Sequence, residues 1–111
     1  MAIPHAQPGD LIDVRPLNGA WEAHRTTTLI KTDQVEVVRM LLPAGKKIAE
    51  HRATGQILIQ GVEGKVVFHT LGRTIEIEAG TMFYLPAAEP HSVEAITNST
   101  FLLTLLLPHS G

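Results

Sequence analysis

The sequence predicts an all-β domain, a sandwich or a barrel. From residue 26 onward, short runs rich in β-branched residues alternate with turn sequences such as Pro43-Ala44-Gly45. Within residues 73–78, Ile75 and Ile77 alternate with charged or polar residues, which is the pattern of a strand with one buried face. No segment has helical periodicity of useful length. Short strands joined by regularly spaced turns are typical of sandwiches and barrels.

Composition narrows the class of protein further. The chain has 111 residues and a mass of 12.1 kDa, which suits one domain. Its net charge of -2 and pI near 6.3 argue against nucleic-acid binding. The sequence contains no apolar segment long enough to cross a bilayer, and its N-terminus does not resemble a secretory signal, so we expect a cytoplasmic protein with no membrane partner. Because cysteine is absent and six histidines are present, any metal ligands must be nitrogen or oxygen atoms.

Residues 1–25 are expected to form an extended N-terminal arm, and residues 26–111 the barrel. The arm contains several prolines and the turn pair Asn18-Gly19, which disfavour long regular elements. Its apolar residues suggest that it packs on the domain, with a short strand near 11–14 and a short, weak helix over 18–25.

Two later segments are apolar on both strand faces, namely 35–42 and 101–107. One face can line a barrel, whereas the second needs cover. We therefore expect a homodimer formed by sheet-to-sheet packing, with Trp21 in the same interface. The alternative is that the arm alone covers the second face.

Two further segments carry a histidine together with Gly or Pro at fixed offsets. In the first, five residues separate Gly45 from His51; in the second, five residues separate Gly80 from Pro86, and His91 follows. These segments resemble the two motifs of the cupin superfamily. The resemblance implies a single-domain double-stranded β-helix, the RmlC-like jelly-roll barrel.

The resemblance also implies a metal-binding site, of which this chain keeps only part. Three His and one Glu form the family's ligand set for a divalent metal, and here His51 and His91 match two of the histidines. Ala53 stands at the other histidine position, and Ile57 or Leu58 at the Glu position. In the second motif, Ala88 replaces a Gly and Ala95 an Asn. A stable site usually needs at least three protein donors, so we expect at most one weakly held divalent ion such as Ni, Mn, Zn or Fe.

Gln56 is the candidate third metal ligand, provided that Thr54-Gly55 forms a bulge that turns its side chain inward. The small side chains of Ala53 and Ala95 are expected to leave room for a small molecule beside the histidines. The predicted ligand-binding residues are His51, Ala53, Ile57, His91 and Ala95.

Three functions remain open. One is a metalloenzyme whose ion acts as a Lewis acid or activates oxygen; the second is a metal-free binding or sensing module; the third is a structural dimer with a filled barrel. His5 and His109 are expected to be exposed, and the roles of His24 and His69 stay open.

Overall fold

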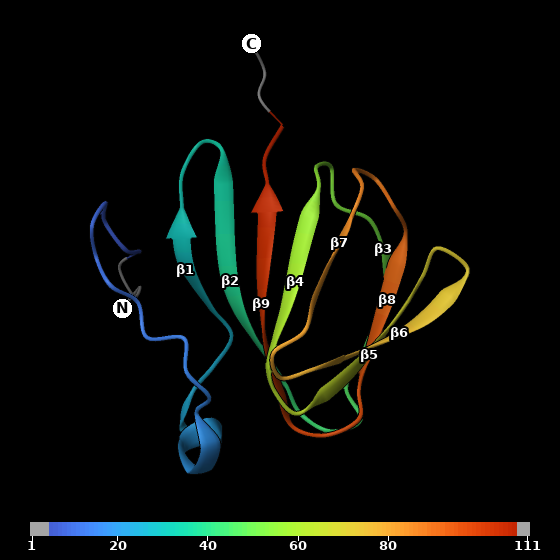
Figure 1. Cartoon of the computed structure of the whole chain (residues 1–111), viewed down its shortest axis with the longest axis horizontal. Helices are drawn as coiled ribbons and strands as arrows, with labels where there is room; N and C mark the ends of the chain where they lie inside the picture. Colours follow the sequence, from blue (N-terminus) through green and yellow to red (C-terminus); the bar gives the residue numbers. More distant parts are fainter. Residues whose placement is uncertain (1–4, 109–111) are drawn as a thin grey trace.

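The structure is a computed structural model that describes residues 5–108 and confirms the all-β prediction. Two antiparallel sheets face each other (Figure 1), with strand orders β1-β2-β9-β4-β7 and β3-β8-β5-β6. The strands are β1 (Thr27–Lys31), β2 (Val35–Leu42), β3 (Lys47–His51), β4 (Ile57–Glu63), β5 (Lys65–Thr70), β6 (Arg73–Glu78), β7 (Met82–Leu85), β8 (His91–Ala95) and β9 (Ser99–Leu106). This is the jelly-roll arrangement that the sequence motifs implied.

The chain crosses from one sheet to the other between β4 and β5, where it turns at Gly64. Gly64 has φ +75°, a conformation that glycine adopts without a steric penalty. A Cβ here would also collide with the backbone of Asn98 and with Ser99. The turn therefore requires glycine at this position.

The core lies between the sheets and is made of side chains that alternate along the strands. Phe68 on β5 is its largest fully buried side chain and packs edge-on against Phe83 and Phe101, with ring centroids 5.1 Å and 5.8 Å away. On β6, Ile77 is buried while Glu76 and Glu78 face outward, each 3.6 Å from the Lys65 ammonium. The predicted alternation of this strand is confirmed.

The arm does not form the strand expected near residues 11–14. These residues are extended chain without strand pairing, and Leu11 is fully exposed. Local hydrogen bonds compete with pairing here, because the Asp13 carboxylate accepts bonds from the backbone amide and the guanidinium of Arg15. The expected short helix is a 3-10 helix, η1 (Asn18–Ala23).

A carboxylate on the barrel holds the arm in place. Glu63, at the end of β4, accepts hydrogen bonds from the backbone amides of Leu17 and Asn18 at 2.9 and 3.0 Å and from the Thr100 hydroxyl at 2.7 Å. The indole of Trp21 donates to the same Thr100 hydroxyl at 3.1 Å. Trp21 thus docks against β9 of its own chain.

Candidate functional site

The two motif histidines lie side by side on neighbouring strands. His51 is the last residue of β3 and His91 is the first of β8. They are paired residues in the antiparallel register, so both side chains project from the same face of the sheet. Their ring centroids are 4.3 Å apart, with an interplanar angle of 61°. We call these two imidazoles the histidine pair.

Both rings are held in the same way by the backbone. Nδ1 of His51 lies 3.0 Å from the carbonyl oxygen of Ala49, and Nδ1 of His91 lies 3.0 Å from that of Glu89. A carbonyl oxygen only accepts hydrogen bonds, so each Nδ1 carries a proton and donates it. In a neutral imidazole the proton on Nδ1 leaves Nε2 with a free lone pair. When both rings are neutral, the histidine pair therefore presents two hydrogen-bond acceptors.

The two rings differ in burial. His91 is only 4 % exposed, whereas His51 is exposed to solvent. Burial lowers the pKa of His91, and the nearby His51 lowers it further; the hydrogen bond to Glu89 and the Glu89 charge oppose this shift without cancelling it. This lowered pKa favours the neutral form of His91, in which the Nε2 lone pair is available.

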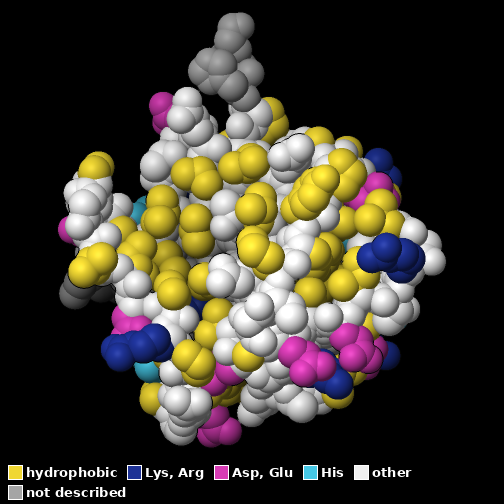
Figure 2. Space-filling model, in the orientation of Figure 1, with side chains coloured by type: hydrophobic (Ala, Val, Ile, Leu, Met, Phe, Trp, Pro, Cys, Tyr) yellow, Lys and Arg dark blue, Asp and Glu magenta, His cyan; other side chains and the backbone are white. Residues whose placement is uncertain are grey.

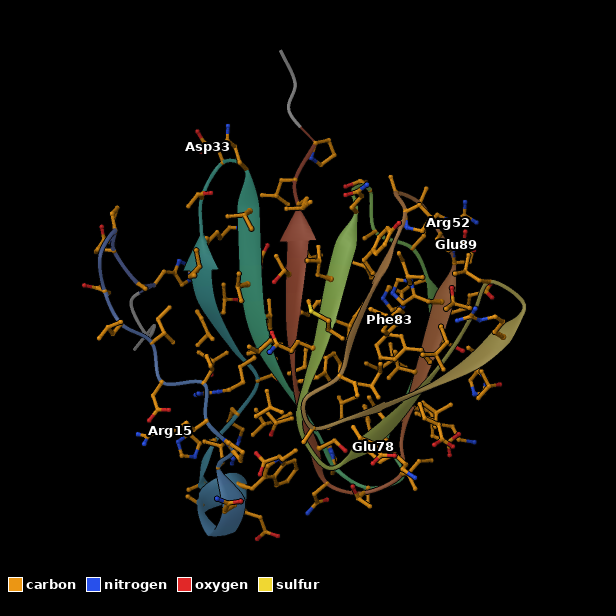
Figure 3. The ribbon with its side chains drawn as sticks, in the orientation of Figure 1. Arg15, Asp33, Arg52, Glu78, Phe83 and Glu89 are labelled. Carbon is orange, nitrogen blue, oxygen red and sulfur yellow. The ribbon has the colours of Figure 1, made fainter. Side chains whose placement is uncertain are left out.

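The surroundings of the histidine pair are apolar on the core side and charged at the rim. The Phe68 ring lies 6.2 Å from that of His91, tilted by 31°. Figure 3 shows Arg52 and Glu89 near each other at the edge of the barrel, with Phe83 deeper between the sheets. Arg52 follows His51 directly, and Glu89 supplies the carbonyl that holds His91. Glu89 also lines an exposed hollow that includes His69 and Arg73.

A loop contact ties the two motifs together beside the histidine pair. The backbone amide of Ala88 donates to the carbonyl oxygen of Ala53 at 2.9 Å, so the Ala53 position contributes through its backbone. Ala88 has φ +64°, a left-handed conformation that disfavours residues with a Cβ. The cupin motif has glycine at this position, and the chain keeps glycine's backbone conformation with an alanine.

Replacing Ala88 with glycine is therefore expected to stabilise the protein by about 1 kcal/mol, because it removes the left-handed strain. Ala87→Gly is the matched control, since Ala87 has no positive φ. The glycine there should only lower stability, because it adds conformational entropy to the unfolded chain. Urea unfolding of the two variants measures the difference. An Ala88→Gly protein no more stable than Ala87→Gly would contradict this account.

Of the other predicted site residues, two lie in the barrel core and one lies on its outer surface. Ala95 is buried in the core at the opposite end of β8, four residues from His91, about 13 Å along a strand. Ile57 is a core residue paired with Leu85 and Leu105. Gln56 is exposed and lines an outer hollow shared with Leu58, Met82, Phe83, Tyr84 and Leu106.

The remaining histidines also lie apart from the pair. His24 is exposed, with Nδ1 3.0 Å from the carbonyl oxygen of Ala20, and His69 is exposed, with Nδ1 3.3 Å from the Thr74 hydroxyl. His5 is exposed, as expected, and His109 lies outside the described residues. What sequence reasoning missed is the role of the Ala49 and Glu89 carbonyls. The only sequence signal is their shared spacing, two residues before each histidine.

The donor set does not fit a metal held by the protein alone. Two imidazole Nε2 atoms are available, and residues 5–108 contain no group of three or more His, Asp or Glu side chains arranged to hold a metal. Gln56 does not supply the missing ligand, because it lies on the outer hollow. A divalent ion with two protein ligands would depend on other molecules for the rest of its coordination.

Comparison with known proteins identifies the family and supports the fold. Residues 38–107 match the family described as Cupin domain. An oxalate-binding protein of Thermotoga maritima is 33% identical over 72 residues, which cover 62% of this chain and 60% of that protein. The chain thus matches about three fifths of the length of this relative.

Solved structures agree with this fold. A cupin superfamily protein from Desulfitobacterium hafniense has a TM-score of 0.76 and 21% identity, covering 93% of this chain and 100% of that one. A conserved protein of unknown function from Streptococcus pyogenes has a TM-score of 0.75 and 17% identity, covering 99% and 97%. At these identities the likeness concerns the fold alone. No helix within residues 5–108 is long and apolar enough to cross a membrane.

Proposed function

The chain belongs to the cupin domain family, and from this premise we propose that it binds a small polar molecule at the histidine pair without a metal of its own. The observation that carries the proposal is the matched arrangement of the two rings. Backbone carbonyls fix both Nδ1 atoms, and two Nε2 atoms are left free on adjacent strands. Such preorganisation lowers the entropic cost of binding a ligand.

The relative from Thermotoga maritima supports this proposal, because its name describes a protein that binds a small molecule. The exposed edge of His51 gives solvent access to the pair, while Phe68 closes the core side. The ligand therefore binds at the barrel edge, near Arg52 and Glu89 (Figure 3). Of the lining residues expected from the sequence, Ala53 lies beside the pair through its backbone bond to Ala88, whereas Ala95 would matter only for a ligand that reached deeper into the core.

Removing either imidazole is expected to weaken binding at least about tenfold, the effect of losing one buried hydrogen bond or more. The probes are small diols, amides and hydroxy acids, and ligand-observed NMR measures their affinity for the wild type, His51→Ala and His91→Ala. His69→Ala is the matched control, because this exposed histidine lies on the same sheet. Equal affinities in all four proteins would rule out the pair as the site.

Elemental analysis of protein purified without a histidine tag tests the metal component of this proposal. We expect less than one equivalent of Ni, Mn, Zn or Fe after dialysis, because two imidazoles hold such ions weakly. A stoichiometric metal that is lost in both His51→Ala and His91→Ala would instead establish the metalloenzyme alternative.

The second candidate function is a structural homodimer. An exposed apolar hollow on the outer surface favours dimer formation. On the outer side of β4, β7 and β9, Met82 and Tyr84 are 60% and 65% exposed and share a hollow with Leu58 and Leu106. Figure 2 shows hydrophobic side chains gathered over the five-stranded sheet. The arm leaves Met82 and Tyr84 exposed, and its hydrogen bonds to the barrel are with β1, β2, β9 and Glu63 at the end of β4.

This hollow contains no charged residue, so two copies can pack face to face without opposing like charges. We expect a mass of about twice 12.1 kDa at micromolar concentration, and a monomer for Tyr84→Lys. Light scattering measures both. A monomeric wild type would contradict the dimer, and it would leave binding at the histidine pair unaffected.

A further inference from the structure

We infer that the ligand of the histidine pair is an uncharged molecule that donates two hydrogen bonds, such as an amide or a vicinal diol, rather than a free carboxylate. This inference rests on the proposed function and adds the chemical class of the ligand. It follows from which nitrogen of each ring carries the proton, because a backbone carbonyl oxygen lies against Nδ1 in both rings.

The first step is the tautomer of each ring. The Ala49 and Glu89 carbonyl oxygens lie 3.0 Å from the two Nδ1 atoms. A ring with its proton on Nε2 would place the Nδ1 lone pair against a carbonyl lone pair, which is repulsive. Each neutral ring therefore keeps its proton on Nδ1 and exposes an acceptor at Nε2. The same contact occurs in both rings, so the pair is a two-acceptor site.

The second step concerns the ligand. A carboxylate carries only acceptors, so an oxygen placed at Nε2 of a neutral His91 would face a nitrogen lone pair and no hydrogen bond could form there. Burial of His91 and its proximity to His51 favour the neutral ring, which works against a proton that would convert it to a donor. An amide or a diol presents N–H or O–H groups to both Nε2 atoms and satisfies them.

This ligand class differs from that of the Thermotoga maritima relative, whose name specifies oxalate. Oxalate and its diamide, oxamide, have the same shape, but oxamide carries N–H donors where oxalate has only acceptor oxygens, so they form a matched pair of probes. The experiment titrates each into the full chain at a pH of about 8, above the usual imidazole range. A chelator is present, so that no metal can bridge oxalate to the rings.

We expect oxamide to bind at least about tenfold more tightly than oxalate, with the preference lost in His51→Ala and kept in His69→Ala. The nitrogen-15 shifts of both rings should show a protonated Nδ1 and an unprotonated Nε2. Protonated Nε2 atoms, or oxalate binding at the pair as tightly as oxamide, would overturn the inference while leaving the proposed site standing. If neither the two probes nor small diols shift the resonances of His51 and His91, the proposed function fails, and the inference fails with it.

Discussion

Replacing Phe68 with alanine is expected to lower the free energy of unfolding by about 3–5 kcal/mol, the usual cost of deleting a fully buried phenylalanine. Phe68 is fully buried and contacts the aromatic rings of Phe83 and Phe101. Its removal would leave a cavity between the two sheets that its rigid neighbours can fill only in part. The same cavity would open beneath His91, whose ring lies 6.2 Å from that of Phe68.

Chemical denaturation with circular dichroism measures this effect. Ile96→Ala is the control, because it removes an apolar side chain that is 48% exposed and should therefore cost much less stability, about 0.5 kcal/mol. The loss of stability in Phe83→Ala should lie between those of Phe68→Ala and Ile96→Ala, since Phe83 is only partly buried. A Phe68→Ala protein as stable as Ile96→Ala would mean that the core is not packed between the sheets as described here.

The motif spacing identified the two site histidines, because His51 and His91 follow Gly45 and Gly80 at set intervals. Their facing positions also depend on an irregularity that the spacing does not predict, since the register of β3 and β8 shifts between Ile48 and His51. Strand alternation did predict the buried and exposed sides of β6. Where a residue's direction follows from the two-residue period of a strand, spacing along the chain determines its place.

The remaining site residues depended on long-range packing that spacing does not encode. Ala95 shares the inward face of β8 with His91, but four residues of strand separate the two. Gln56 would have needed a bulge to turn inward, and it lies instead with the outward residues Leu58 and Tyr84. The pattern of apolar residues also did not predict the local hydrogen bonds from Arg15 to the Asp13 carboxylate. These features are set by neighbours distant in sequence, or by side-chain hydrogen bonds that compete with strand pairing.

Glu63→Gln is expected to lower the free energy of unfolding by about 2 kcal/mol and to release the arm. Three donors converge on this carboxylate, from Leu17, Asn18 and Thr100, and hydrogen bonds to a charged group contribute about 1.5–3 kcal/mol. A glutamine would turn an amide N–H toward one of these donors. Since Trp21 is the chain's only tryptophan and bonds to Thr100, its fluorescence reports whether the arm is docked.

The effect of this variant should depend on pH in a defined direction. Burial raises the pKa of Glu63, but the hydrogen bonds from Leu17, Thr100 and Asn18 lower it more, so the folded-state pKa lies below the ordinary value of 4.5. A carboxyl group with a lowered folded pKa stabilises the protein above its unfolded pKa and loses that contribution as pH falls through the folded value. The stability difference between wild type and Glu63→Gln should therefore be constant above a pH of about 6 and shrink below about 4.5.

Glu76→Gln is the control for this titration, because Glu76 is an exposed carboxylate 3.6 Å from Lys65, and surface pairs of this kind contribute about 0–1 kcal/mol. Limited proteolysis gives a second readout, since a released arm is cleaved near Arg15 or Arg25 while the barrel stays intact. If Glu63→Gln matched Glu76→Gln in stability, in Trp21 fluorescence and in cleavage, the arm would have to be held by its apolar contacts and by the bond from Ala6 to Leu29. The charge on Glu63 would then have no part in docking it.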